Sequence, residues 1–356
     1  MSVSSIIHFQ RQPFPGNHSI ERVFQTVRGA MVETDVRVHI CRYPSRGIGR
    51  RLANLFAAAR AQGRINHITG DVHYLAMLLH RDRTVLTVHD CRTMSRLGGV
   101  RRRLYQWLWL KIPVSRARLV TVVSEQTRQE VLRYTGCPES KIRVIGNPVS
   151  NSLRPWPRSF HSERPTILQV GTADNKNLTR VAEALAGIPC TLRVIGRIEA
   201  DVDATLRKSG IDYCSSPEVS DEQLAEEYRA ADMVVFCSTY EGFGMPIVEA
   251  NAVGRPVVTS DREPMRSVAG GAACLVDPCD AASIRAGVLK VIHDDAYRAS
   301  LIEAGWENAQ RFRPEVIAAA YMAAYCELAT QSSLCSIPLS VARLQPGEIQ
   351  HDSRTH

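Results

Sequence analysis

Residues 233–254 read MVVFCSTYEGFGMPIVEANAVG and join a strand, a turn and a helix in immediate succession. The opening apolar run, MVVFCS, is typical of a strand buried on both faces. Gly242 and Gly244 remove side chains from the turn, so that bare backbone can approach a ligand. Pro246 suits the first position of a helix, and Gly254 suits its end. A strand that leads straight into a helix predicts one unit of a parallel α/β sheet.

The same alternation of short β-like runs and helical patterns covers most of the chain. The clearest helical segment is 124–136, with Ser124 as N-cap and Gly136 as the stop. Another helix begins at Ser220, which forms an S-x-x-Q capping box with Gln223. Strands are predicted at 5–9, 35–40, 65–69, 84–89, 119–124, 141–145, 166–171, 191–196, 211–215 and 233–238. This pattern predicts parallel, doubly wound sheets.

The length of 356 residues predicts two domains. Residues 149–165 are polar and contain prolines, as an inter-domain linker does. A long helical pattern at 313–329 is expected to close the second domain. We therefore predict a first domain at 1–150, a linker at 151–165, a second domain at 166–330 and a disordered tail at 331–356.

Composition favours a protein of the reducing cytosol. No run of 18 apolar residues occurs, so no transmembrane helix is expected. The N-terminus lacks the basic region of a signal peptide. The ten cysteines include no CxxC pair, and several, such as Cys237 and Cys274, stand in apolar runs. We therefore expect a cytoplasmic protein with neither a disulfide framework nor metal ligands.

The net charge of +8 conceals an asymmetry between the two halves of the chain. Residues 1–163 hold 26 Lys and Arg against 10 Asp and Glu, whereas the remainder holds 18 against 26. In the densest basic stretch, 100–118, Arg101–Arg103 precede Tyr105, Trp107, Leu108, Trp109 and Leu110. Such a mixture suits a helix at a membrane interface, although an ordinary helix with solvated arginines has the same pattern. We expect peripheral contact with an anionic membrane rather than nucleic acid.

Two carboxylates flank the glycine turn of the opening segment. Glu241 follows the strand directly, at the edge of a parallel sheet where ligands bind. Glu249 lies about one turn into the helix, whose N-terminus is an anion site that suits a diphosphate. Carboxylates accept hydrogen bonds from vicinal hydroxyls, so the pair suits a nucleotide-sugar. In the alternative interpretation, Glu249 only complements the helix dipole and Glu241 is a surface residue.

The segment EGFGMPIVEA resembles the E-x7-E signature of family-4 (group 1) retaining glycosyltransferases of the GT-B fold, and the likeness extends over residues 224–278. The resemblance implies two Rossmann-like domains facing each other across a cleft. It implies that Glu249 binds the nucleotide ribose and that Glu241 contacts the donor sugar. It also implies that the turn backbone holds sugar hydroxyls and phosphate, at Gly242, Phe243, Gly244 and Met245.

A second stretch, QVGTADNKNL at 169–178, resembles the V-G-T-x-x-x-R-K-N-L loop of the same family. Gly171 matches the family glycine, and Lys176 matches the lysine that neutralises the donor diphosphate. Asn175 replaces the family arginine, and the loop looks one residue shorter. Neutralisation then depends on Lys176 alone, or is helped by Arg197.

In the first half, LTVHDC at 86–91 resembles a family strand end whose histidine holds the donor sugar or positions the acceptor. The resemblance thus places His89 in the cleft, and we expect catalysis from His89, Glu241 and Lys176. The usual glycine-rich first turn is replaced by PFPGNHSIERVF at 13–24. Candidate acceptor-side residues are Gly16, Asn17, His18, Thr69 and Asp71.

Other functions are less well supported by the sequence. SRGIGRRLA at 45–53 resembles the end of a dehydrogenase cofactor turn, but no earlier glycine and no Tyr-x-x-x-Lys pair accompanies it. The resemblance implies a metal-independent hexosyltransferase that needs no cofactor and transfers sugar with retention to a glycan or lipid-linked acceptor. The product would be a bacterial-type cell-surface polysaccharide or glycolipid. The alternative is a catalytically silent GT-B protein that acts as a membrane-associated scaffold.

Overall fold

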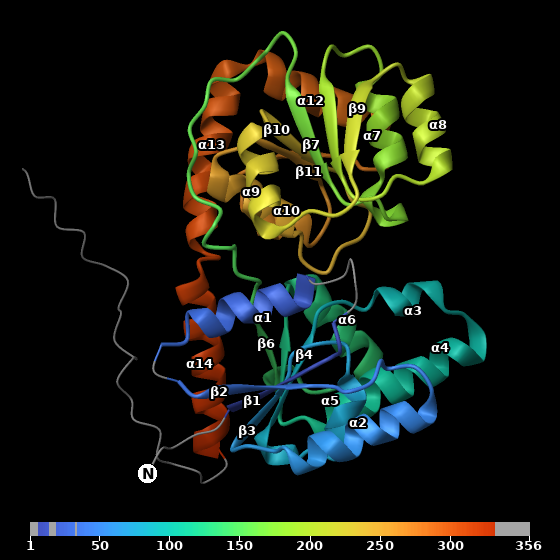
Figure 1. Cartoon of the computed structure of the whole chain (residues 1–356), viewed down its shortest axis with the longest axis vertical. Helices are drawn as coiled ribbons and strands as arrows, with labels where there is room; N and C mark the ends of the chain where they lie inside the picture. Colours follow the sequence, from blue (N-terminus) through green and yellow to red (C-terminus); the bar gives the residue numbers. More distant parts are fainter. Residues whose placement is uncertain (1–5, 14–18, 33, 332–356) are drawn as a thin grey trace, which may run out of the picture.

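The computed structural model describes residues 6–13, 19–32 and 34–331, which form two α/β units (Figure 1). Each unit contains a six-stranded, wholly parallel sheet. The first sheet has the order β2-β1-β3-β4-β5-β6 and the second β12-β11-β10-β7-β8-β9. The second order is that of a doubly wound dinucleotide-binding sheet. The predicted α/β fold class is confirmed.

The strands of the first sheet are β1 (Ile6–Gln10), β2 (Val36–Ile40), β3 (Ile65–Ile68), β4 (Thr84–Val88), β5 (Leu119–Val122) and β6 (Ile142–Val144). Those of the second are β7 (Thr166–Val170), β8 (Thr191–Ile195), β9 (Asp212–Ser216), β10 (Met233–Phe236), β11 (Val257–Ser260) and β12 (Cys274–Val276). Ten of these match predicted strands within a few residues. The other two, β11 and β12, span four and three residues, which is too short for periodicity to identify.

Helices lie on both faces of each sheet (Figure 1). The first unit contains α1 (Ser19–Gly29), α2 (Ile48–Arg60), α3 (Arg92–Arg96), α4 (Gly99–Tyr105), α5 (Ile112–Arg116) and α6 (Glu125–Thr135), with short turns η1 (His73–Met77), η2 (Arg81–Arg83), η3 (Gln106–Lys111) and η4 (Glu139–Lys141). The later elements are η5 (Asp174–Lys176), α7 (Leu178–Leu185), α8 (Ala200–Lys208), α9 (Asp221–Ala230), α10 (Met245–Val253), α11 (Met265–Ala269), α12 (Ala281–His293), α13 (Asp295–Gln310) and α14 (Pro314–Gln331).

The predicted helix ends at α6 and α9 are confirmed. The Ser124 side chain accepts a hydrogen bond from the Thr127 backbone, and Gly136 ends α6 in the left-handed conformation. Ser220 and Gln223 form the complete capping box at the start of α9. Local sequence decides these ends because capping satisfies backbone groups that no distant segment reaches.

The stretch predicted as one interfacial helix, 100–118, is interrupted by the π-helical turn η3. Pro113 lacks the N–H that would bond the Trp109 carbonyl four residues earlier, and its ring crowds that carbonyl. The Trp109 oxygen instead accepts a hydrogen bond from Nδ1 of His73, at 3.0 Å. The break turns Leu110 inward, whereas Trp107 and Leu104 stay exposed.

Helix α14, which was expected to close the second domain, packs instead against the first sheet and α1 (Figure 1). Tyr325 Oη lies 3.0 Å from Nε2 of His8 and 2.6 Å from Nδ1 of His67. Nε2 of His67 lies 2.7 Å from Oγ1 of Thr87. Burial lowers the pKa of His8 to about 3 and that of His67 well below its usual value, so both rings are neutral. A buried polar network therefore attaches α14 to the first domain.

Replacing Tyr325 with phenylalanine is expected to lower the free energy of unfolding by about 2 kcal/mol, because two buried imidazoles lose a partner. Urea denaturation followed by circular dichroism measures this difference. Tyr134→Phe is the matched control, since the Tyr134 hydroxyl has no hydrogen bond to the described residues. Equal stabilities of the two variants would show that the network does not hold α14.

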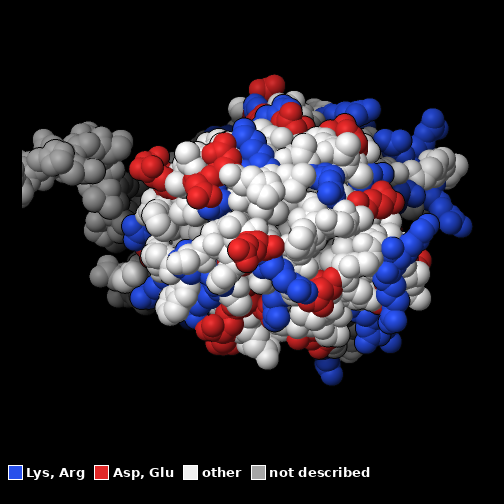
Figure 2. Space-filling view, turned by 90° about the horizontal axis from the view of Figure 1, so that it is seen from above, with Lys and Arg blue, Asp and Glu red and all other residues white. Residues whose placement is uncertain are grey.

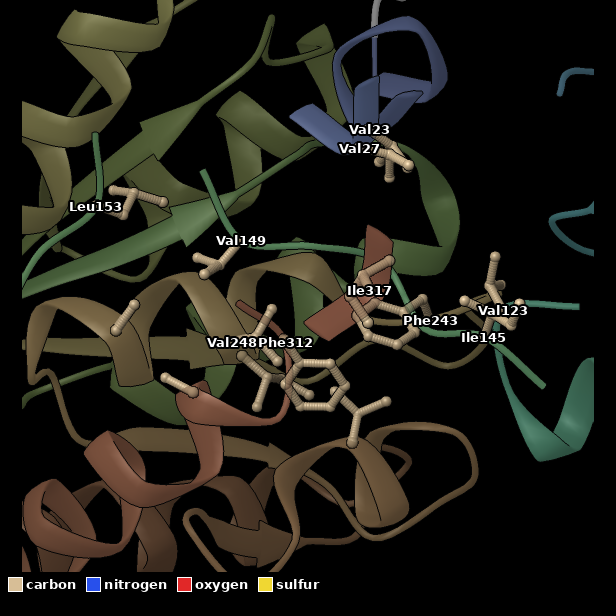
Figure 3. Close-up of a cluster of buried hydrophobic side chains, with 14 of the residues drawn as sticks. Val23, Val27, Val123, Ile145, Val149, Leu153, Phe243, Val248, Phe312 and Ile317 are labelled. Atoms are coloured by element: carbon tan, nitrogen blue, oxygen red, sulfur yellow. The ribbon is translucent and has the colours of Figure 1, made fainter. Parts of the chain in front are cut away.

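One hydrophobic cluster joins the two domains across the connecting segment. Figure 3 shows Phe243, from the glycine turn of the second domain, near Ile145 and Val123 of the first. The rings of Phe243 and Phe312 meet edge to face, with centroids 5.4 Å apart. A Cβ at Gly146 would lie 3.1 Å from the Phe243 ring, so a glycine there lets the ring pack closely. This cluster positions the turn against the first domain.

Candidate active site

A cleft of about 680 Å³ lies between the domains, lined at the carboxyl ends of strands from both sheets. His89 follows β4 in the first sheet, Lys176 follows β7, and Glu241 follows β10 in the second. In the second sheet, β7 and β10 are the neighbours at which the strand order reverses. Ligands of open α/β sheets bind at such a position.

Lys176 and Glu241 form an ion pair in this cleft, with Nζ 2.7 Å from Oε1. Gly171 makes the pair possible, because its φ is +89° and a Cβ there would lie 2.8 Å from Cε of Lys176. The Nζ also lies 4.7 Å from the centroid of the Phe236 ring. A carboxylate and an ammonium group therefore lie side by side in the lining of the cleft.

Asn175, which stands where the family has an arginine, is buried behind this pair. Its Nδ2 donates to the Tyr240 carbonyl at 2.8 Å and to Oε1 of Glu241 at 3.2 Å. Asn175 therefore orients Glu241 and adds no positive charge. Arg197 is exposed, and the described residues that line the cleft do not include it. Lys176 is thus the cation that this loop brings to the cleft.

Glu249 lies on the first turns of α10, on the cleft side. Its Oε2 accepts a hydrogen bond of 2.6 Å from the Tyr228 hydroxyl. Burial raises the pKa of Glu249, while the Tyr228 hydrogen bond and the charges of Arg22 and Lys176 oppose the rise. The carboxylate is therefore poorly solvated and well oriented, which strengthens any hydrogen bond it accepts from a ligand.

Helix α10 begins in the way that the sequence predicts. Gly244 is the N-cap, with φ +109°, a conformation that L side chains rarely adopt. The N–H groups of Gly244 and Met245 precede the first helical hydrogen bond and have no partner within the helix. With the positive end of the helix dipole, they form an anion site that opens on the cleft. The Phe243 ring lies in the inter-domain cluster, and the residue also lines the cleft, so a ligand contact by its backbone stays a prediction.

His89 lines the cleft from the first domain. Its Nε2 lies 2.8 Å from the Thr69 carbonyl oxygen, which can only accept, so this nitrogen carries the proton. Burial lowers the pKa of His89. The ring is therefore neutral, and Nδ1 keeps its lone pair.

Of the five predicted acceptor-side residues, the structure describes two, and only one of these two lines the cleft. Asp71 lines the cleft, with Oδ2 3.2 Å from a guanidinium nitrogen of Arg11. Thr69 is buried and acts through its carbonyl on His89. The remaining three, Gly16, Asn17 and His18, lie outside the described residues.

The glycine turn is docked directly on the first domain. Ser124 Oγ donates to the Gly242 carbonyl at 2.7 Å, and a Cβ at Gly242 would overlap the His89 carbonyl oxygen. The Tyr240 hydroxyl donates to Glu130 at 2.9 Å. Across the cleft mouth, Arg22 pairs with Asp221 at 2.7 Å. These inter-domain partners form no motif and lie far apart in the chain, so the sequence alone does not predict them.

Most of the first-domain wall of the cleft is likewise not predicted from the sequence. The residues of this wall include His73, Arg92, Arg96, Tyr105 and Trp109. One signal was available, because α3 begins four residues after Val88, the last residue of β4, at the sheet edge where ligands bind.

The described residues contain no group of three His, Cys, Asp or Glu side chains placed to hold a metal ion. The Asp-x-Asp triplet of the chain, 201–203, lies on α8 outside the cleft, where Asp203 binds Arg207 and Tyr213. Within the same residues, no helix combines the length and apolar character needed to cross a membrane.

Comparison with protein families gives two matches that divide the chain near the linker. Residues 155–307 match the family described as glycosyl transferases group 1, and residues 18–153 match glycosyltransferase family 4. An O-antigen chain mannosyltransferase B of Escherichia coli is 30% identical over 66% of this chain and 68% of its own. A phosphatidyl-myo-inositol mannosyltransferase of Mycobacterium leprae is 29% identical over 59% of each chain.

Solved structures of the same architecture cover nearly the whole chain. Sucrose-phosphate synthase of Thermosynechococcus elongatus has a TM-score of 0.73 at 18% identity and covers 92% of this chain and 100% of its own. HepE of Anabaena, in complex with UDP and glucose, has a TM-score of 0.72 at 15% identity, over 91% and 100%. At these identities the likeness shows the fold alone.

Proposed function

The chain belongs to the group 1 (family 4) glycosyltransferases of the GT-B fold, and from this premise we propose how it works. It transfers a sugar from a nucleotide-sugar donor to a hydroxyl of a glycan or lipid-linked acceptor, with retention and without a metal ion. The nucleotide binds the second domain, and the acceptor enters from the first. The observation that carries this proposal is the meeting of Glu249, the Lys176–Glu241 pair and the α10 N-terminus in one cleft.

Each of these groups has a part in the proposed reaction. Glu249 accepts hydrogen bonds from the ribose, and the α10 N-terminus with Lys176 stabilises the negative charge that develops on the leaving diphosphate. Glu241 orients the donor sugar, and its Asn175 and Lys176 contacts hold it in place. His89 offers its neutral Nδ1 to a donor or acceptor hydroxyl. Positive charge at the diphosphate thus comes from the protein itself, which is the basis for proposing metal independence.

Mannose is the sugar that we propose for transfer, because both curated relatives described above are named mannosyltransferases. Their names also support a role in cell-surface polysaccharide or glycolipid synthesis. The donor base is proposed as uracil or guanine. The HepE complex shows that a protein of this fold can hold UDP.

A nucleotide screen followed by a transfer assay tests the proposal. UDP or GDP is expected to raise the melting temperature, since a ligand that binds the folded state stabilises it. The corresponding mannose donor should then label an acceptor in the presence of EDTA, and the anomeric coupling constant in the product NMR spectrum should show retention. A protein that binds no nucleotide, or that binds one without any turnover, would contradict the enzyme and favour the silent scaffold.

We also propose that the protein is cytoplasmic and rests on the inner face of an anionic membrane through two helices of the first domain. On α2, Ile48, Leu52 and Phe56 recur every four residues and are exposed. On α4 and η3, Val100, Leu104 and Trp107 form a second exposed stripe. Figure 2 shows Lys and Arg side chains gathered on the side of the molecule where α3 and α4 lie in Figure 1. Apolar stripes beside basic residues favour an interfacial position.

Replacing Leu52 and Phe56 with serine should lower the partition coefficient onto phosphatidylglycerol-containing vesicles about tenfold, because two apolar side chains leave the interface. Co-sedimentation in low and high salt measures it. The control is Leu275→Ser with Val316→Ser, two exposed apolar residues outside both stripes. The membrane contact would be refuted if the two double variants bound vesicles equally, or if wild-type binding did not depend on anionic lipid.

A further inference from the structure

Two arginines of α3 face the cleft without an ionic partner. Arg92 and Arg96 are separated by one helical turn and both line the cleft from the first domain. Neither forms an ion pair with any described residue. The other cations that line the cleft are paired: Arg11 with Glu21 and Asp71, Arg22 with Asp221, and Lys176 with Glu241.

The carboxylates near α3 do not neutralise the two arginines. Asp90 accepts a hydrogen bond of 2.9 Å from the Arg92 backbone N–H, and its carboxylate lies in no ion pair with either guanidinium. Asp71 is held by Arg11. Arg92 and Arg96 are therefore the cations lining the cleft that form no ion pair among the described residues, and they lie on the first-domain wall, whereas Lys176 and Glu241 belong to the second domain.

An aromatic wall stands beside the arginines. The Tyr105 and Trp109 rings are stacked, with centroids 5.9 Å apart and an angle of 16° between planes. Both line the cleft, together with Thr93 and His73. The Arg51 guanidinium lies over the Trp109 ring, 4.6 Å from its centroid. The aromatic surface left uncovered, beside hydroxyl and imidazole groups, suits a sugar ring, which has apolar C–H faces and polar edges. A saccharide on this wall would have its neighbouring group within reach of Arg92 and Arg96.

The surface next to α3 carries exposed apolar side chains among exposed arginines, because α4 also contains Arg101 and Arg103. Helix α4 begins three residues after Arg96, and its stripe of Val100, Leu104 and Trp107 is exposed, with Val100 at 81%. At this side of the cleft the chain therefore places an aromatic wall, two arginines without an ion pair and an exposed apolar stripe on neighbouring elements. These three surfaces suit a sugar, an anionic group and an apolar chain.

We propose that Arg92 and Arg96 form a phosphate subsite on the acceptor side of the cleft, which holds the phosphate that joins the acceptor sugar to an apolar carrier. The assignment to the acceptor rests on the proposed function, in which the donor occupies the opposite wall. Guanidinium groups suit this task because they bind phosphate oxygens through charge-assisted hydrogen bonds.

Binding of defined phosphates tests the subsite by titration calorimetry, without nucleotide. The probes are farnesyl phosphate, farnesol as the same chain without phosphate, and glucose 1-phosphate as a phosphate without the chain. Farnesyl phosphate is expected to bind about tenfold more weakly to the R92Q/R96Q variant than to the wild type. The matched control is R81Q/R116Q, which removes two exposed first-domain arginines that do not line the cleft.

The comparison among probes distinguishes a lipid carrier from a free sugar phosphate. Preference for farnesyl phosphate over both other probes supports the carrier. The subsite is overturned if R92Q/R96Q binds farnesyl phosphate like the wild type, if farnesol binds equally well, or if glucose 1-phosphate binds best.

Nucleotide binding is measured separately, so the two proposals can fail independently. Unchanged UDP or GDP affinity in R92Q/R96Q supports the acceptor assignment. If R92Q/R96Q loses only nucleotide affinity, the two arginines belong to the donor site and the acceptor assignment is overturned. If wild type binds no nucleotide, the proposed glycosyl transfer fails, whereas the phosphate comparison still decides the subsite.

Discussion

Replacing Glu249 with glutamine is expected to weaken nucleotide binding about 100-fold, because the ribose hydroxyls lose a charged acceptor in a poorly solvated site. The Tyr228 hydroxyl, 2.6 Å from the carboxylate, can still donate to the amide oxygen, so the side chain keeps its orientation. Nucleotide affinity of the wild type should also fall on acidification, at a higher pH than an ordinary glutamate would give, because burial raises the pKa of Glu249.

The same substitution is expected to stabilise the free protein at neutral pH. A folded-state pKa above the unfolded value means that the folded state binds the proton more tightly. The contribution of Glu249 to stability therefore falls as pH rises from the ordinary glutamate pKa through the raised one. Glutamine removes this loss, since it never ionises.

Isothermal titration with UDP and GDP, together with urea denaturation without ligand, measures both effects of Glu249→Gln. Tyr228→Phe is the informative companion, because it removes the orienting hydroxyl but keeps the charge; a smaller loss of affinity is expected from it. Wild-type nucleotide affinity in Glu249→Gln would remove the ribose assignment, even if the stability changed as expected.

Replacing Lys176 with methionine is expected to lower kcat about 100- to 1000-fold, the range seen when a preorganised donor to a developing oxyanion is lost. Methionine keeps much of the apolar stem that lies over Gly171 and beside Phe236. The ion pair to Glu241 is lost, although Asn175 still donates to that carboxylate. The loss of kcat should therefore reflect weaker stabilisation of the leaving diphosphate more than a displacement of Glu241.

Single-turnover transfer measures the chemical step of Lys176→Met. Lys176→Arg should recover part of the rate, since it restores charge with altered geometry. Lys208→Met, an exposed change on α8, serves as the control for loss of one positive charge. A wild-type rate in Lys176→Met would show that the helix N-terminus alone stabilises the diphosphate.

Several features of the fold are readable from the chain because their causes are local. The Ser124 and Ser220 caps, the Gly254 stop and ten of twelve strands depend on neighbours within a few residues. The break at η3 was missed because its cause combines Pro113 with a distant donor, His73. The docking of α14 was missed for a similar reason, since Tyr325 meets His67, which lies 258 residues earlier.

In the candidate site, too, some residues are predicted from local sequence and others are placed only by tertiary packing. Sequence by itself determined the second-domain half: a strand, a glycine turn and a helix N-terminus place Glu241 and Glu249 by short-range geometry, and Lys176 is recognisable in its loop. Only the tertiary structure decided the other half, in which Gly242 meets Ser124 across 118 residues and α3 turns Arg92 and Arg96 into the cleft. Backbone hydrogen bonding and capping act within one element and leave a pattern in the chain. Packing of one domain against another depends on shapes and charges brought together from distant segments, and no local pattern records it.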